Sequence, residues 1–459
     1  MALAREALAR GAIPLADPFA YVPTVEPFVH HEWASGFLLF ALVSWLGGAG
    51  LLLLRTLLVA ALAAACWSCA RARGASFAVA ACVAPIGILL VSRSLTTVRA
   101  QMLTLLFMAL LLRWLEQDRA GSRRWIAPWL LVHTAWVNLH GGFVVGVGVF
   151  ALHTLEQALR RRPVAHLALA GLLMLALLAA TPYGWSHVSA VWQALFLDRE
   201  HIGEWGPISG SSGIEIGVLA FSLLLLSYAL RSAGLRGATG LVILLGSLMQ
   251  ALLHQRHLSL YAVACMCLVP AWLERTPLGA AAGRAWRGAP RRATAIGLLL
   301  GVAAAAFLVR AEPWRLRLPV NRAENRLIVY PAGAVEYLAR TGFSGNVMTP
   351  FEVGAFVTWK LHPRVKVGLD GRYEAAYPAE HATEIARFYA AREGWRTTLA
   401  RHPTDLVLAR RDAPLVGEMR AAGGWPEVYV DDEFVLLARP GLALPVEDRR
   451  GTRLQASFP

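Results

Sequence analysis

Acidic and histidine side chains gather within the first 35 residues of the chain. Asp17 lies in an Asp-Pro-Phe sequence, and His31 and Glu32 directly precede Trp33. Carboxylates in such positions can take a proton from a sugar hydroxyl or hold a divalent cation, and His31 can serve in either role. The alternative is a loop outside the membrane, with an Asp-Pro turn and a tryptophan at the interface. Spacing alone favours that structural alternative.

Two arginines are placed where they could bind a phosphate. Arg99 lies between two apolar runs, and Arg256 lies in the sequence His-Gln-Arg-His at 254–257. A guanidinium can form paired hydrogen bonds with phosphate oxygens, and Arg256 could also stabilise a leaving phosphate. The structural alternatives are an Arg99 side chain that reaches the interface and a short polar turn around Arg256.

Two more polar residues follow apolar runs. His140 ends one run and precedes two glycines, and Glu204 precedes Trp205. Polar groups at membrane depth usually face a cavity, and glycine lets a ligand or a second backbone approach closely. Glu204 is a further candidate acid for a metal or an acceptor. The alternatives are a tight turn in which His140 caps a neighbour and a solvated Glu204 beside an interfacial tryptophan.

Membrane helices must position these residues. The 459 residues are 56% hydrophobic and 16% charged, and the mean hydropathy is +0.49. A membrane-spanning helix needs about 20 residues. Ten apolar runs approach that length, at 50–71, 75–95, 97–116, 124–140, 142–159, 164–182, 214–231, 238–254, 257–273 and 293–311. The expected fold is therefore a polytopic α-helical membrane protein, with a transmembrane domain of about ten helices at residues 50–311.

The net charge of +14 has a regular distribution. Arginines fill every second connection between the apolar runs, which predicts that these connections are cytoplasmic. The intervening connections, with His140, Glu204 and Arg256, would then face outward. This pattern explains the basic charge without a nucleic-acid partner. Residues 1–49 are expected to form an outer loop with interfacial helices, because the run at 33–46 is too short to cross.

The composition changes after residue 312. Strand-like runs at 346–349, 365–370, 405–409, 427–430 and 434–438 alternate with helical runs at 352–361, 378–391 and 414–422. This order predicts a small extracytoplasmic α/β domain at 312–459 with a mainly parallel sheet and a final antiparallel hairpin. The sequence Asp370-Gly-Arg372 favours an Asp-Gly turn with an arginine pair over a ligand site.

Several cofactor classes have no support in the sequence. Cys66-x-x-Cys69 lies in an alanine-rich apolar run, where packing is favoured over metal or redox chemistry. The chain has no phosphate-binding loop of the Walker type, no zinc spacing and no dinucleotide fingerprint. No nucleotide cofactor is therefore expected.

The N-terminal motif also carries a family resemblance. The stretch G-x-I-P-x-x-D-P-F-x-Y at 11–21, followed by H-E-W at 31–33, resembles the first outer loop of bacterial GT-C superfamily glycosyltransferases. These include the protein O-mannosyltransferase-like and aminoarabinose-transferase-like groups. The resemblance covers roughly residues 10–275 as architecture. It implies an inner-membrane enzyme that moves a sugar from a polyprenyl-phosphate donor to a lipid, glycan or protein acceptor outside the cytoplasm.

The resemblance also implies roles for the candidate residues. The acids Asp17, Glu32 and Glu204 would act as base or metal ligands, with a divalent cation held by Asp17 and Glu32. Arg99 and Arg256 would hold the phosphate, and His31 and His140 would orient the substrate. Relatives place a key aspartate directly after a first membrane helix, so such a helix is expected upstream of Met1, and the chain without it could be inactive. The alternatives are a transporter or flippase, and a non-catalytic scaffold that presents the C-terminal domain.

Overall fold

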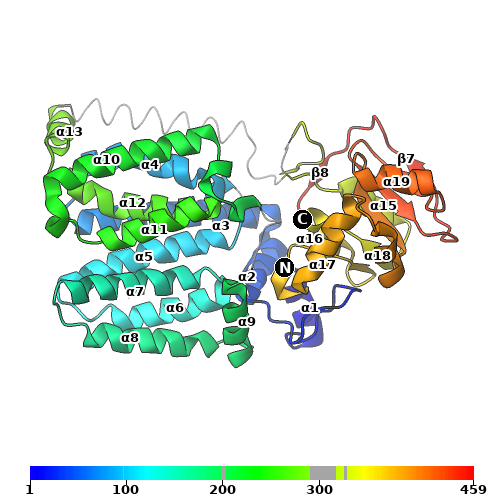
Figure 1. Ribbon diagram of the computed structural model, residues 1–459, viewed down its shortest axis with the longest axis horizontal. Coiled ribbons are helices and arrows are strands. Elements are labelled where there is room, and N and C mark those ends of the chain that lie inside the picture. The colour runs from blue at the N-terminus through cyan, green and yellow to red at the C-terminus, as the bar shows by residue number, and fades with distance from the viewer. Residues whose placement is uncertain (97, 198–202, 290–316, 325–327) are drawn as a thin grey trace. The chain divides into compact units, whose positions relative to one another are not determined.

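The computed structural model describes residues 1–459 except 97, 198–202, 290–316 and 325–327. The chain forms two compact units (Figure 1). We call Gly50–Pro313 the helical unit, and Met1–Ala49 together with Trp314–Pro459 the α/β unit.

Helices make up the described part of the helical unit, and most of them are apolar. They are α3 (Gly48–Ala72), α4 (Phe77–Thr96), α5 (Gln101–Arg119), α6 (Ile126–Leu139), α7 (Phe143–Leu159), α8 (Ala165–Ala176), α9 (Trp185–Leu195), α10 (Gly213–Gly237), α11 (Leu241–Leu253), α12 (Leu258–Leu273) and α13 (Pro277–Gly288). Each of the nine predicted apolar runs up to residue 273 contains one of these helices. The tenth predicted run, 293–311, lies outside the described residues.

The helical unit has the surface of a membrane protein. Among the residues that the structure describes, four stretches are long and apolar enough to cross a bilayer: Gly48–Ala72, Phe77–Leu95, Gly213–Ser232 and Gln255–Leu273. Large apolar side chains point outward from the helices, such as Leu131 at 75% exposure. Water would oppose the exposure of so much apolar surface, whereas lipid tails accept it. These helices are compatible with the predicted helical membrane protein, and the transmembrane domain of about ten helices stays a prediction.

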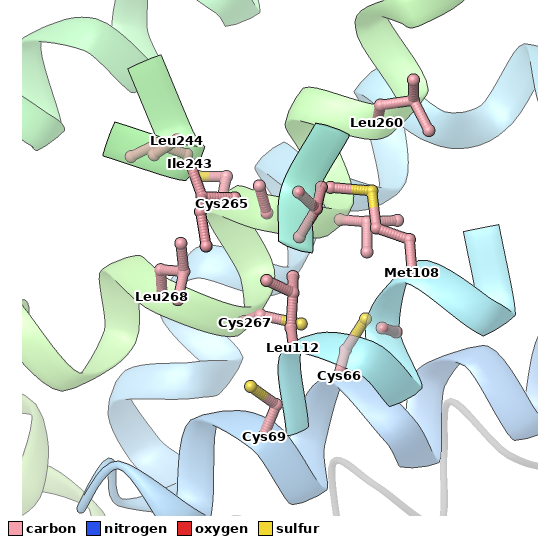
Figure 2. Packing of buried hydrophobic residues seen from close by; sticks show 14 of the residues in the cluster. Cys66, Cys69, Met108, Leu112, Ile243, Leu244, Leu260, Cys265, Cys267 and Leu268 are labelled. Carbon is pink, nitrogen blue, oxygen red and sulfur yellow. The ribbon is translucent and has the colours of Figure 1, made fainter. Parts of the chain in front are cut away.

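The core of the helical unit is centred on α12. All but one of its 16 residues are buried, and it packs against α4, α5, α10 and α11. Figure 2 shows Cys267 of α12 beside Cys66 and Cys69 of α3, with Leu112 of α5 nearby. These three cysteines are free, buried thiols among apolar side chains. Their surroundings agree with the packing interpretation of the Cys66-x-x-Cys69 spacing.

A six-stranded mixed sheet forms the centre of the α/β unit. Its strand order is β3-β2-β4-β6-β5-β7. The bounds are β2 (Gly345–Met348), β3 (Val365–Val367), β4 (Leu406–Arg410), β5 (Glu427–Val430), β6 (Phe434–Ala438) and β7 (Glu447–Asp448). The pairs β2–β3, β2–β4 and β5–β7 are parallel, whereas β4–β6 and β5–β6 are antiparallel. A separate two-stranded sheet joins β1 (Arg317–Leu318) to β8 (Ala456–Ser457).

The five predicted strands and three predicted helices of this region are all present. The three predicted helices correspond to α16 (Phe351–Leu361), α17 (Ala379–Tyr389) and α19 (Pro414–Ala422). Two helices that were not predicted are also present, α15 (Ala332–Arg340) and α18 (Trp395–Arg401). The predicted final hairpin is confirmed. Its turn is held by Asp431, whose Oδ1 accepts hydrogen bonds from the backbone N–H groups of Glu433 at 2.8 Å and Phe434 at 2.7 Å.

The N-terminal segment is built into the α/β unit. It contains α1 (Ala2–Arg10) and α2 (Trp33–Leu46). Between them, Ala20 forms a parallel bridge with Val367, so the segment continues the sheet beside β3. Phe19 and Phe28 are buried in the same hydrophobic cluster as core residues of the C-terminal part. The membrane side of residues 1–49 stays a prediction.

Candidate functional site

Three of the predicted site residues come together in the helical unit. The Glu204 carboxylate lies 3.1 Å from Nη1 of Arg99 and 3.8 Å from Nη1 of Arg256. Arg99 precedes α5, Glu204 lies in a single 3-10 turn at 203–205, and Arg256 lies in another at 255–257. The Arg99–Glu204–Arg256 cluster thus joins three segments that are far apart in the sequence.

Local contacts hold the two short turns of this cluster together. The Trp205 ring lies 4.4 Å from the Arg256 guanidinium, which is close enough for a cation–π interaction. The imidazole Nδ1 of His254 donates to the Trp205 carbonyl at 2.7 Å, and the backbone N–H of Gln255 donates to the Gly206 carbonyl at 2.9 Å. These bonds fix the backbone around Glu204 against the turn that carries Arg256.

The cluster is open to its surroundings. The side chains of Arg99, Glu204 and Arg256 are 45%, 39% and 22% exposed. Partly exposed arginines can exchange a carboxylate partner for a phosphate of higher charge, because both present oxygens that match the guanidinium fork. The arrangement can therefore bind an anionic group, with a carboxylate left beside it.

His140 lies in a buried hydrogen-bonded chain next to α5. Its Nδ1 accepts a hydrogen bond from the Gly142 backbone N–H at 2.9 Å and lies 2.7 Å from the Thr104 hydroxyl. The indole N–H of Trp136 donates to the same hydroxyl at 3.0 Å. Nδ1 acts as the acceptor, which leaves the ring proton on Nε2 of the neutral imidazole. The tight turn of the structural alternative is present, and the hydrogen-bond partners of His140 Nδ1 are groups of the protein itself.

Helix α5 connects His140 to the arginine cluster. Thr104, the partner of His140, lies three residues after Gln101, so the two side chains share one face of the helix. The Gln101 side-chain amide donates to the backbone carbonyl of Arg256 at 3.3 Å. The first turn of α5 therefore contacts both His140 and the turn of Arg256.

The remaining predicted residues belong to the α/β unit. The Asp17 side chain is fully buried, and its Oδ1 accepts hydrogen bonds from Nη1 of Arg372 at 2.6 Å and from the backbone N–H of Phe19 at 2.8 Å. The second bond forms the turn that the structural alternative for Asp17 predicts. Nε2 of His31 lies 3.9 Å from Oε1 of Glu32, and both side chains are about one third exposed.

Arg372 joins Asp17 to the predicted Asp-Gly turn. Its Nε donates to both oxygens of Asp370, at 2.9 and 3.0 Å, and its guanidinium lies 4.8 Å from the Phe19 ring. Burial opposes the charge, yet the carboxylates of Asp370 and Asp17 raise the pKa of Arg372 above its ordinary value. The arginine pair predicted for Asp370-Gly-Arg372 is confirmed. Asp17 therefore fastens the N-terminal segment to this turn.

Sequence reasoning missed a charged network at the other end of α5. Glu116 pairs with Arg73 and Arg119, and Arg119 donates to Glu156 at 2.8 Å. Glu156 also accepts from the backbone N–H of Gly240 at 2.9 Å. The network links α3, α5, α7 and the start of α11. The sequence did contain a signal for this network, because Glu116 and Glu156 lie near arginines at the helix ends. The topology prediction counted only the arginines and made no use of these acids.

A groove between α7 and α8 has a different character. Its volume is about 410 Å³, and apolar side chains line it, including Phe150, Leu167 and Met174. No charged side chain lines the groove. It offers space for a hydrocarbon chain and not for a charged headgroup.

Comparison with known proteins assigns no family. No protein-family model matches the chain, and no curated protein matches it.

Proposed function

We propose that this membrane protein is a glycosyltransferase that resembles the GT-C superfamily. It would transfer a sugar from a polyprenyl-phosphate donor to an acceptor on the outer side of a bacterial inner membrane. The observation that supports the proposal most is the Arg99–Glu204–Arg256 cluster, in which two partly exposed arginines share one carboxylate. The apolar helices would place this cluster where lipid headgroups are found.

The cluster suits the charge changes of such a transfer. The acceptor hydroxyl oxygen attacks the anomeric carbon of the sugar, and the bond from that carbon to the phosphate oxygen breaks. Arg99 and Arg256 hold the phosphate, and they stabilise the negative charge that grows on it as it leaves. Glu204, released from the arginines by the phosphate, takes the proton of the acceptor hydroxyl. The divalent cation expected at Asp17 and Glu32 stays a prediction.

The proposal can be tested by the transfer of radiolabelled sugar from polyprenyl phosphate in membranes that carry the protein. We expect Arg256→Gln and Glu204→Gln each to lower the transfer rate roughly 10²-fold, because each removes one charged partner of the reacting groups. Arg124→Gln is the matched control. Arg124 is an exposed arginine just before α6, and its replacement should leave the rate unchanged.

Equal transfer by all four proteins would contradict the proposal. It would show that neither Arg256 nor Glu204 takes part in the transfer. The absence of transfer by any of the four proteins would instead favour the alternative in which the chain is a membrane scaffold that presents the α/β unit. One observation favours that alternative: Asp17, a predicted catalytic residue, is committed to its ion pair with Arg372. The scaffold predicts no transfer by any version of the protein.

A further inference from the structure

Three possible metal ligands lie together in the α/β unit. His381 and Glu384 are on α17, and His402 directly follows α18. Oε2 of Glu384 lies 3.9 Å from Nδ1 of His381 and 3.4 Å from Nε2 of His402, and all three ligand atoms are within 4.8 Å of one another. Ligand atoms of tetrahedral zinc lie about 3.3–3.5 Å apart, given metal–ligand distances near 2.0–2.1 Å. Small side-chain movements would bring the three atoms to that spacing.

His381 is held in the orientation that metal-binding histidines adopt. Its Nε2 lies 2.8 Å from the backbone carbonyl oxygen of Gly368. A carbonyl can only accept, so Nε2 carries the proton and Nδ1 presents its lone pair toward Glu384. A hydrogen bond of this kind to the second nitrogen typically orients a histidine ligand. The Tyr377 ring stacks on the imidazole, with 5.5 Å between the ring centroids, which further restrains the orientation of His381.

The Glu384 carboxylate supplies the negative charge of the group. Its Oε2 lies between Nδ1 of His381 and Nε2 of His402, at 3.9 and 3.4 Å. A metal ion bound by the two histidines would also be attracted by this carboxylate. Arg401 donates from Nη1 to the other oxygen of Glu384 at 3.0 Å, which orients the carboxylate and leaves Oε2 toward the histidines.

We propose that His381, Glu384 and His402 bind a divalent transition metal of the zinc class. Two imidazole nitrogens and one carboxylate oxygen match zinc, whereas calcium and magnesium prefer oxygen ligands alone. Both histidines are buried, and the Glu384 side chain is 21% exposed, so a metal ion can reach the group from the side of Glu384. The metal would join α17 to the end of α18. This site is separate from the proposed transfer reaction.

The test uses the full-length protein, purified in detergent and stripped of metal with a chelator. Zinc is titrated against a competing chromogenic chelator, and bound metal is measured by mass spectrometry. We expect one zinc ion per chain. Glu384→Gln and His402→Asn should each weaken zinc binding by at least about tenfold. Removal of a residue that only contacts a metal ligand typically costs about 10–100-fold in affinity, and removal of a ligand itself should cost no less. Glu380→Gln, an exposed carboxylate on the same helix, should bind zinc as the wild type does.

X-ray absorption of the zinc-loaded wild-type protein supplies a readout that no variant's folding affects. We expect scattering from two imidazoles and from light oxygen neighbours. Failure of the wild type to bind zinc, wild-type binding by both substituted proteins, or an absorption spectrum without imidazole scattering would each overturn the proposal. Wild-type binding by both variants would place the metal elsewhere, for example at Asp17 and Glu32.

Discussion

At the scale of single residues, Asp17 has a structural role, because its carboxylate pairs with the buried guanidinium of Arg372. Asp17 and Asp370 both pair with this guanidinium, and the rings of Phe19 and Phe28 lie 4.8 and 5.7 Å from it. A buried ion needs such partners, because removal from water costs several kcal/mol. The Asp17 carboxylate thus has a role in stability that does not require a substrate.

We expect Asp17→Asn to destabilise the α/β unit by about 1–3 kcal/mol, because it removes one of the two carboxylates that compensate a buried guanidinium. Hydrogen exchange of peptides from residues 11–28 and 368–378 would detect the change. Glu26→Gln is the control, since Glu26 is an exposed carboxylate in the same segment. Wild-type exchange in Asp17→Asn, together with lost sugar transfer, would instead support a catalytic Asp17.

Gly142 is a second position where one atom decides the local geometry. A Cβ at this residue would overlap the Thr104 hydroxyl and approach Nδ1 of His140 to 2.6 Å. We expect Gly142→Ala to separate His140 from Thr104 and to destabilise the helical unit by about 1–3 kcal/mol, as overpacking in a core does. Thermal unfolding in detergent measures the effect.

Gly148→Ala provides the matched control for Gly142→Ala. Gly148 lies in α7, and a Cβ there would meet nothing within 4 Å. Alanine is a better helix former than glycine, so this substitution should leave stability unchanged or raise it slightly. A similar loss of stability in both proteins would contradict the role given to the Gly142 contact.

At the scale of elements, α5 carries polar contacts at both of its ends. Gln101 and Thr104 contact the segments of Arg256 and His140, whereas Glu116 and Arg119 join the charged network. A helix of 19 residues is about 28 Å long, and the two sets of contacts lie near its opposite ends. The apolar middle of α5 packs in the core between them.

Helix α1 gives a pH-dependent prediction. Oε2 of Glu6 lies 2.8 Å from Nε2 of His362. Burial would raise the pKa of Glu6, but the bonds and charges of His362 and Arg10 outweigh it and hold the pKa below its ordinary value. A lowered pKa stabilises the fold above about pH 4.5, and this contribution is lost as the pH falls through the folded-state pKa.

We therefore expect α1 to exchange its amide hydrogens increasingly fast as the pH falls below about 4.5, after correction for intrinsic exchange rates. Glu6→Gln should remove most of this pH dependence, because glutamine has no proton to gain. Hydrogen exchange of residues 2–10 across that pH range makes the comparison. Parallel pH profiles in the two proteins would show that Glu6 does not link α1 to pH.

At the scale of the whole molecule, local patterns predicted the elements well. The apolar runs up to residue 273 contain helices, and strands such as β5 and β6 fall at their predicted positions. Hydrophobic periodicity and turn residues are short-range signals, so they can be found in one sequence. Arg99, Glu204 and Arg256 were each singled out by residue type, and the fold brings them together.

Long-range pairing could not be predicted in the same way. Asp17 meets Arg372 across 355 residues, and Ala20 pairs with Val367. Nothing in the local sequence of either partner specifies the other. The His381 group escaped notice for the same reason, because His402 is on a separate helix end and the spacing matches no zinc motif.

The most direct test of the account is the binding of radiolabelled polyprenyl phosphate to the purified protein. The Arg99–Glu204–Arg256 cluster predicts saturable binding that weakens about tenfold or more in Arg256→Gln, since a charge-assisted bond to phosphate is lost. Binding to Arg124→Gln should match the wild type. Equal affinity of the wild type and Arg256→Gln would contradict a phosphate site at this cluster.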